Sequence, residues 1–233
     1  MALAAPEFQA ELERLRSTPN VDYPGVANAK LPLLEQLFEV TSSDERRGYN
    51  DHAPADPALE PHVAALRWAE AVVFVYPTWW YGMPAMMKGW LDRVLVYGPM
   101  YNSRLRHEHG AMRGKRALLS VTTGSSARAC AVDGREGDTR LLLWPLMYSL
   151  RYVGFDVMEP HVVHGVRSGL APERVQAHDE ALAAATHHYR ERLAQWPQWP
   201  TVPFNDSSDF EDGVVLRAEA TTYSPFIRHR NAG

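Results

Sequence analysis

Two short stretches of this sequence carry residue types that could hold a flat ligand with polar edges. Residues 77–82 read PTWWYG and follow the apolar run AVVFVY, and residues 122–126 read TTGSS and follow ALLSV. Aromatic side chains can wall a planar ring and exclude water, while backbone N–H groups near a helix start can stabilise negative charge on it. Thr122, Thr123 and Ser125 add hydroxyl groups, and Gly124 allows close backbone approach.

A reduced flavin fits this description, because its negative charge lies on one edge of its ring. Simpler interpretations of the same residues stay open. Aromatic residues that follow a strand commonly serve only in packing, and a Gly-Ser pair after a strand is ordinary turn chemistry. The elements that flank the two stretches therefore matter as much as the stretches themselves.

Continuous apolar runs at 71–76 and 117–121 predict strands buried on both faces, and 155–163 predicts a weaker third strand. Helical patterns occupy 57–70, 84–96, 139–153 and 173–194. Strands that alternate with helices indicate an α/β fold with a parallel sheet, in which ligands bind beyond the carboxyl ends of the strands. Both polar-aromatic stretches should lie at that edge.

The two ends of the chain differ from this central region. Residues 6–17 predict a helix, and 18–56 reads as irregular chain with at most one short helix. From Trp196 onward the sequence WPQWPTVPF has too many prolines for a regular helix. We expect one domain at 1–195, whose segment 1–56 is irregular or helical, and an extended C-terminal arm at 196–233. The expected anchors of this arm are Trp196, Trp199, Phe204 and Phe210.

Composition narrows the function classes. The 233 residues carry a net charge of −4, which does not favour binding to nucleic acid or to an anionic membrane. The single cysteine, Cys130, cannot form an internal disulfide, so we expect a reducing, cytoplasmic location. No apolar run is long enough to span a membrane, and the N-terminus lacks a secretory signal pattern.

The stretch VYPTWWYGMPAMMKGWLDRVL resembles the signature of the flavodoxin-like NAD(P)H:quinone oxidoreductase family. That family carries an apolar strand, then Pro-x-x-Trp-aromatic-Gly-x-Pro-Ala, then Lys-Gly-Trp and an acidic-Arg-Val run. A second block at 114–165, GKRALLSVTTG followed by GD and LLLWPLMYSLRYVGFDVMEPHVVHG, is also similar to the family. The resemblance extends over about 59–194. Matching residues in the first block are Pro77, Trp80, Tyr81, Gly82, Pro84, Ala85, Lys88, Gly89, Trp90 and Arg93.

The resemblance implies a flavodoxin-like, three-layer α/β fold with a parallel sheet, FAD or FMN as cofactor, and NAD(P)H as hydride donor. It implies that hydride passes to the flavin and then to a quinone, by turns at one site, at the interface of a homodimer. Tyr101 matches a family tyrosine on the substrate side. The residues expected to surround the flavin ring are Pro77, Thr78, Trp79, Trp80, Tyr81, Thr122, Thr123, Gly124 and Ser125.

Two features depart from the family pattern. Members begin with a strand, a phosphate-binding loop and a helix, whereas residues 1–17 show a helix with no apolar strand before it. We therefore expect an N-terminally incomplete sheet in which strand 71–76 is a bare apolar edge. One explanation is that this chain begins too late, through a misplaced start codon or a trimmed N-terminus. The other is that the protein has really lost flavin binding.

The second departure concerns the polar residues that relay charge beside the ring, a Tyr and a His or similar residues in the family. Those two positions fall on Cys130 and Glu136. A cysteine cannot make the same hydrogen bond, and Glu136 could take up a proton only in a buried setting. The sequence therefore predicts slower or altered catalysis at this site.

These observations predict a flavin-dependent oxidoreductase that reduces quinones or similar electrophiles with NAD(P)H. One rival hypothesis is a flavin-free relative that serves in dimerisation or regulation, and another is a non-redox enzyme with Cys130 as nucleophile. We expect no metal at the HEH motif, residues 107–109, because it lacks a third spaced ligand. Arg104 and Arg106 could meet a nucleotide phosphate or simply be exposed. His161 and His164 are expected at the surface or in packing.

Overall fold

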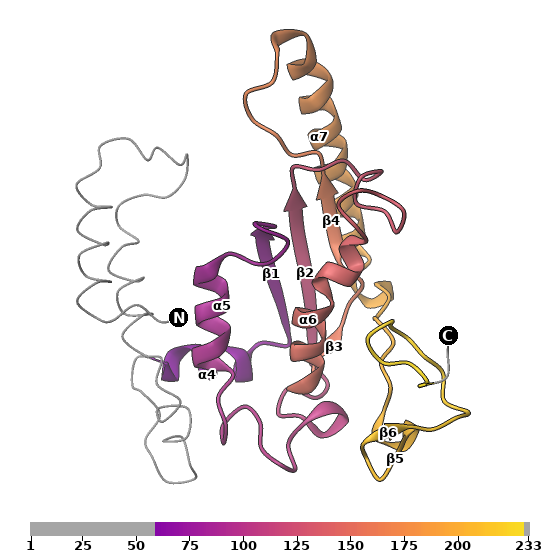
Figure 1. The fold of residues 1–233 in the computed structure, drawn as a ribbon. Helices are drawn as coiled ribbons and strands as arrows, with labels where there is room; N and C mark the ends of the chain where they lie inside the picture. Colours follow the sequence, from indigo (N-terminus) through magenta and orange to yellow (C-terminus); the bar gives the residue numbers. More distant parts are fainter. Residues whose placement is uncertain (1–58, 231–233) are drawn as a thin grey trace, which may run out of the picture. The chain divides into compact units, whose positions relative to one another are not determined.

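The computed structural model describes residues 59–230, and its helices and strands are labelled in Figure 1. The predictions for residues 6–17 and 18–56, and the question of how the sheet begins, lie outside these residues. Within 59–230, strands and helices alternate in the predicted order. No helix of this part of the chain is long and apolar enough to cross a membrane.

A four-stranded parallel sheet forms the centre of the described region. Strand β1, Ala71–Pro77, pairs along its whole length with β2, Arg116–Thr123. The other side of β2 pairs first with β3, Asp156–Val157, and then with β4, His161–His164. The predicted third strand at 155–163 is thus two short strands. The proline at its break, Pro160, has no N–H to donate to the ladder, which explains the interruption.

Within residues 59–230, four α-helices accompany the sheet: α4, Glu60–Trp68; α5, Ala85–Val94; α6, Thr139–Tyr152; and α7, Pro172–Ala194. The four predicted helices are confirmed, with ends that differ by a few residues. Helix α6 begins where the side chain of Asp138 accepts the backbone N–H of Arg140, at 2.8 Å. Helix α7 begins at Pro172, whose missing N–H costs nothing in a first turn.

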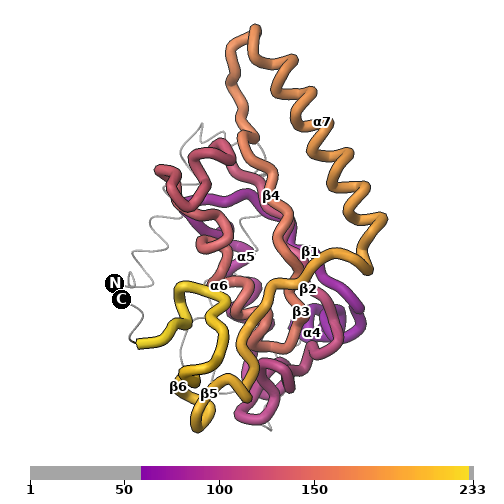
Figure 2. Tube along the Cα trace, turned by 90° about the vertical axis from the view of Figure 1, so that its right-hand side faces the viewer, coloured from indigo at the N-terminus to yellow at the C-terminus, as the bar shows by residue number. Residues whose placement is uncertain are grey.

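The helices lie on opposite faces of the sheet (Figures 1 and 2). On one face, Leu119 and Val121 of β2 form a core with Leu91 of α5 and Met147 of α6. Helix α4 contributes to the same core. On the other face, Leu118 of β2 lies in a smaller cluster that α7 covers. Because β2 is covered on both sides, all of its residues from 117 to 121 are buried.

The prediction that strand 71–76 is buried on both faces is wrong. Phe74 and Tyr76 face the main core and are buried, but the side chains of Val73 and Val75 on the opposite face are 41% and 73% exposed. In register, Val73 lies beside the fully buried Leu118 of β2. Among residues 59–230, no strand pairs with the outer edge of β1. Two neighbouring strands with equally apolar sequences therefore differ in what covers them.

The C-terminal arm covers the opposite edge of the sheet. The backbone N–H of Val202 donates to Val157, and that of Glu159 donates to Pro200, both at 2.8 Å. The expected anchor Trp199 is buried, and its ring N–H donates to the carbonyl of Glu159 at 2.8 Å. Beyond it, the arm forms a small hairpin of β5, Phe210–Glu211, and β6, Val215–Leu216. The arm is thus docked on this edge of the sheet through residues 199–202.

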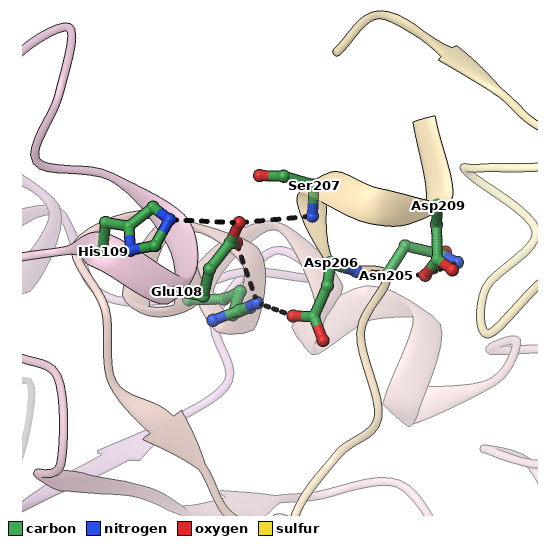
Figure 3. Close-up of polar contacts among 7 residues, drawn as sticks. Glu108, His109, Asn205, Asp206, Ser207 and Asp209 are labelled. Carbon is green, nitrogen blue, oxygen red and sulfur yellow. Dashed lines mark hydrogen bonds and ion pairs between the residues drawn. The ribbon is translucent and has the colours of Figure 1, made fainter. Parts of the chain in front are cut away.

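A cluster of charged groups fastens this arm to the body of the domain (Figure 3). Arg151 of α6, whose side chain is largely buried, contacts the carboxylates of Glu108 and Asp206. Glu108 belongs to a short 3-10 helix, η2, His107–His109, and also accepts the backbone N–H of Ser207 at 3.3 Å. One guanidinium therefore bridges the body and the arm.

A glycine pair brings η2 close to the end of α6. A Cβ atom placed on Gly110 would lie 2.4 Å from the carbonyl carbon of Val153, and one on Gly154 would lie 2.8 Å from Gly110. Real Cβ atoms do not approach backbone so closely. Gly154 also has a φ of 104°, in the region that favours glycine. The two backbones cross in direct contact only because neither residue has a side chain.

Candidate active site

The loops that follow β1 and β2 meet at the carboxyl edge of the sheet. Pro77 and Thr122 are the last partners of the two strands, and the next residue, Thr78, donates its backbone N–H to the carbonyl of Thr122 at 2.8 Å. The hydroxyl of Thr78 donates to the same oxygen at 3.2 Å. The structure therefore brings together the two stretches that the sequence singled out.

The aromatic residues form a tight turn with an unusual backbone. Trp79 and Gly82 exchange two backbone hydrogen bonds of 3.0 Å, and the residues between them, Trp80 and Tyr81, have φ values of 51° and 61°. This is the geometry of a type I′ turn, whose central positions favour Asn and Gly. Two bulky residues held there cost about 1–3 kcal/mol each. Strain of this kind is common at ligand sites.

The turn exposes aromatic rings and backbone hydrogen-bond donors to its surroundings. The side chain of Trp80 is 97% exposed and that of Tyr81 is 58% exposed, although both are large and apolar. Their backbone N–H groups donate to no acceptor among residues 59–230. Two adjacent free donors beside two open aromatic rings form a surface that suits a planar ligand with acceptor atoms on its edge.

The second loop is held in place from the side of β4. Gly165 donates its backbone N–H to Ser125 at 2.9 Å, and Arg167 donates its Nε–H to the carbonyl of Gly124 at 2.6 Å. Within the loop, the backbone N–H of Ser125 donates to the hydroxyl of Thr123 at 3.3 Å. Sequence reasoning missed Arg167, because it lies 43 residues from its partner and no local pattern marks it.

His164 lies at the same edge, because it is the register partner of Thr123 at the end of β4. Its Nδ1 atom is buried and has no hydrogen-bond partner in the described part of the chain. Burial lowers the pKa of this imidazole below its ordinary value, against the opposing effect of a backbone hydrogen bond with Ser125. His161 faces a different region, where it is buried and its ring stacks on Tyr189 at 4.2 Å.

The two expected relay positions have different surroundings. Glu136 accepts the hydroxyl proton of Tyr81, with 2.7 Å between the phenol oxygen and Oε2. Cys130 is buried, and its backbone carbonyl accepts the N–H of Thr139 at the start of α6. The hydrogen bond to Glu136 is the main reason why the pKa of the Tyr81 phenol is raised above its ordinary value of 10.0, followed by the charge of the carboxylate. Of this pair, Glu136 makes a hydrogen bond to the aromatic turn.

Tyr101 lies in a neighbouring groove of about 450 Å³, lined by residues of α5 and α6. Its ring packs edge-on against Tyr97 and Tyr152, with ring centroids 5.8 and 5.5 Å away. Met83, the residue after the aromatic turn, lines the same groove. The structure therefore places Tyr101 beside the candidate site rather than within the two loops.

The residues of the two loops fit the ring of a flavin. The ring needs flat apolar walls and hydrogen-bond donors for the acceptor atoms on its edge, and the turn supplies both through Trp80 and Tyr81. The hydroxyls of Thr123 and Ser125 add further donors within the adjoining loop. The unpartnered Nδ1 of His164 is a further polar atom at this edge. No group of three His, Cys, Asp or Glu residues that could hold a metal ion occurs within 59–230.

Comparison with known proteins agrees with this geometry. The model of the flavodoxin-like fold family matches residues 3–192. The chain therefore belongs to the flavodoxin-like fold family, and the fold predicted from the sequence is confirmed. Its relatives include NAD(P)H dehydrogenase (quinone) 1 of Rattus norvegicus, with 38% identity over 171 residues.

Coverage of these relatives varies. The match with the rat protein covers 69% of this chain and 59% of the relative, so the chain spans little more than half of that protein. The ribosyldihydronicotinamide dehydrogenase-like protein traD of Penicillium crustosum is 31% identical, over 88% of this chain and 74% of its own length. A solved structure of a candidate quinone reductase from Klebsiella pneumoniae is 30% identical with a TM-score of 0.57, and the match covers 71% of this chain and 64% of that one.

Proposed function

We propose that this chain is a flavin-dependent oxidoreductase that transfers two electrons from NAD(P)H to quinones or similar acceptors. The observation that carries the proposal is the junction of the two loops at the ends of β1 and β2. There, a strained aromatic turn offers open rings and two free N–H groups beside a hydroxyl-bearing loop. The named activities of the relatives support the same reaction class.

Each part of the site has a distinct task in this proposal. Trp79, Trp80 and Tyr81 wall the ring and exclude water from one side. The free N–H groups of Trp80 and Tyr81 stabilise negative charge on its edge, as oriented backbone donors do in many enzymes. When bound, FAD or FMN supplies the two-electron carrier between NAD(P)H and acceptor. The remaining expected contacts are Pro77, Thr78, Thr122, Thr123, Gly124 and Ser125.

Further features of the proposal concern substrate and assembly. The groove that holds Tyr101 adjoins the turn through Met83, which supports a place for Tyr101 on the acceptor side. We propose a homodimer in which two copies complete the site, in a cytoplasmic setting, as the single free thiol of Cys130 also suggests. The domain at 1–195 and the arm at 196–233 are part of the same proposal.

A visible spectrum tests the proposal directly. The purified chain should show flavin absorbance, either as isolated or after addition of FMN or FAD and removal of excess. It should then oxidise NADH or NADPH only when a quinone is present, with the parallel-line kinetics of a ping-pong reaction. The variant Trp80→Ala should lose flavin, while Trp68→Ala, a change at an exposed tryptophan of α4, should retain it. Absence of flavin binding under all these conditions would remove the redox proposal and leave the flavin-free hypothesis.

A further inference from the structure

A phenol and a carboxylate face each other across the candidate site. Tyr81 belongs to the aromatic turn after β1, and Glu136 belongs to the loop between β2 and α6, 55 residues further along the chain. Their hydrogen bond of 2.7 Å is the contact that joins the turn to this loop through side chains. Tyr81 is exposed and Glu136 is half-buried, so a ligand on the turn and a proton from water can each reach the pair.

The loop is shaped so that Glu136 points back to the turn. The backbone N–H of Glu136 donates to Ala129 at 2.9 Å, and a Cβ atom on Gly134 would lie 2.2 Å from the same carbonyl oxygen. The loop therefore doubles back on itself, which is possible because position 134 has no side chain. Immediately after it, Asp138 caps helix α6 and fixes the end of the loop.

The charged and titratable groups that face Tyr81 are few. Glu136 accepts its proton, the carboxylate charge opposes its ionisation, Arg135 favours ionisation, and the thiol of Cys130 has a small opposing effect. The sum raises the pKa of the phenol, so Tyr81 keeps its proton at neutral pH. Such a phenol can donate its proton in every reaction cycle only if another group supplies a new proton to it.

We propose that Tyr81 is the proton donor to the acceptor during its reduction, and that Glu136 is the positioning residue that holds the Tyr81 hydroxyl and replaces its proton from solvent. This inference rests on the proposed function, and it concerns residues of this chain alone. Position 130 holds a buried cysteine, so the phenol of this proposal comes from the turn after β1.

The proton and electron balance is simple. Reduction of a quinone to a hydroquinone adds two electrons and two protons, and NAD(P)H supplies both electrons and one of these protons together as hydride. The second proton must come from another source. When Glu136 takes a proton from water, the hydrogen bond of the pair reverses, because the carboxyl O–H now donates to the phenol oxygen. The Tyr81 O–H bond then breaks toward the acceptor oxygen while the Glu136 proton moves to Tyr81, which restores the phenol and the carboxylate.

Four single variants separate this role from a structural one. Tyr81→Phe keeps the aromatic wall but removes the transferable proton. Glu136→Gln keeps a hydrogen-bonding side chain but cannot replace a proton. The matched controls are Tyr223→Phe in the arm and Glu180→Gln on α7, both outside the site. The reaction of the reduced protein with a quinone is followed by stopped flow across pH, separately from the reaction of the oxidised protein with NAD(P)H.

Tyr81→Phe should bind flavin and react with NAD(P)H normally, but it should reduce the quinone about 100-fold more slowly, as for loss of a general acid. In the wild type, the quinone step should slow as pH rises, and Glu136→Gln should flatten this pH dependence. Both controls should behave as the wild type does. An unchanged quinone step in Tyr81→Phe, or an unaltered pH profile in Glu136→Gln, would overturn the assignment.

A titration without any cofactor tests the pair independently of activity. The phenol of Tyr81, followed by NMR with ¹³C-labelled tyrosine and assigned with Tyr81→Phe, should ionise at lower pH in Glu136→Gln than in the wild type. No such change would show that the pair does not form in solution, and the inference would fail even if the chain reduces quinones. If the titration changes as expected but the protein binds no flavin, the proposed function fails, and the proton-donor role fails with it.

Discussion

The two edges of the described sheet differ in what covers them. At the β3 edge, the chain's own arm supplies backbone partners, a buried tryptophan and a bridging arginine. At the β1 edge, no strand of residues 59–230 pairs with the backbone, and two valines of one face are exposed. The candidate site lies at the carboxyl end of the less covered strand, where the strained turn follows directly.

This difference separates stability from function within one sheet. Strand β2 is buried on both faces and the arm adds the buried Trp199 and Val202 beside it, while the turn after β1 holds two residues in costly conformations. Regions that bind ligands are commonly drawn from the less stable parts of a fold. We therefore expect substitutions at the two edges to change the free energy of unfolding by different amounts. At the turn, the change should have the opposite sign.

The largest difference should appear between two tryptophans. Trp199→Ala removes a buried ring that packs against Leu118 and Met158, so we expect a loss of about 3–5 kcal/mol in the free energy of unfolding. Trp68→Ala changes a side chain that is 87% exposed, and its effect should stay within about 0.5 kcal/mol. Urea denaturation measures both. Equal effects would show that the arm does not pack on the sheet as described.

The next comparison uses residues that lie side by side on one face. Leu118→Ala should cost about 2–5 kcal/mol, because the side chain is fully buried, whereas Val73→Ala should cost less than about 1 kcal/mol. Chemical denaturation of the two variants provides the test. A large loss in Val73→Ala would mean that this face of β1 is covered in solution.

Substitutions in the aromatic turn should increase the free energy of unfolding rather than decrease it. Replacement of Trp80 by Asn and of Tyr81 by Gly supplies the residues that a type I′ turn favours, so we expect a gain of about 1–2 kcal/mol together with loss of flavin binding. Thermal unfolding and the visible spectrum measure the two effects. The control for the stability measurement exchanges Trp79 for Phe, which leaves both left-handed positions unchanged. Destabilisation by Asn-Gly would show that the turn is not strained.

The smallest expected effect is the pH dependence of the stability that Glu108 contributes where it contacts the arm. Burial alone would raise the pKa of Glu108, but hydrogen bonds from Ser207 and from the backbone, with the charge of Arg151, outweigh it and lower the pKa. A lowered pKa means that the carboxylate stabilises the fold above its unfolded pKa of about 4.3 and loses this effect as pH falls through the folded value.

Glu108→Gln should therefore cost up to about 1 kcal/mol at pH 7 and less at pH 3. Unfolding free energies at the two pH values, with Glu180→Gln on α7 as control, measure this dependence. A cost that does not change with pH would contradict an ionised Glu108 in the cluster.

Much of the sheet and its loops could be predicted from local patterns. The apolar run 117–121 and the helical spacing of 139–153 each match an observed element, and the ends of two parallel strands must share one edge. The same reasoning failed for Val73 and Val75, because an apolar run does not indicate what covers each of its faces.

Contacts between distant loops were beyond prediction for a related reason. Tyr81 and Glu136 meet only because the 126–137 loop doubles back at Gly134, and Arg167 meets Gly124 only because β4 ends beside β2. Neither path follows from residue type or from spacing. The aromatic turn itself was visible in the sequence, but its left-handed backbone was not, since Trp and Tyr rarely adopt it.

The contact between Gly110 and Gly154 limits how this protein can change over time. A single methyl group at either position would push η2 away from the end of α6, and Glu108, which η2 carries, would move away from Arg151. Two small residues outside the two loops of the candidate site thus decide whether the arm has an attachment point. Substitutions at these positions would be selected against because they disturb the fold, before any effect on catalysis. Libraries for directed evolution should therefore leave both codons unaltered.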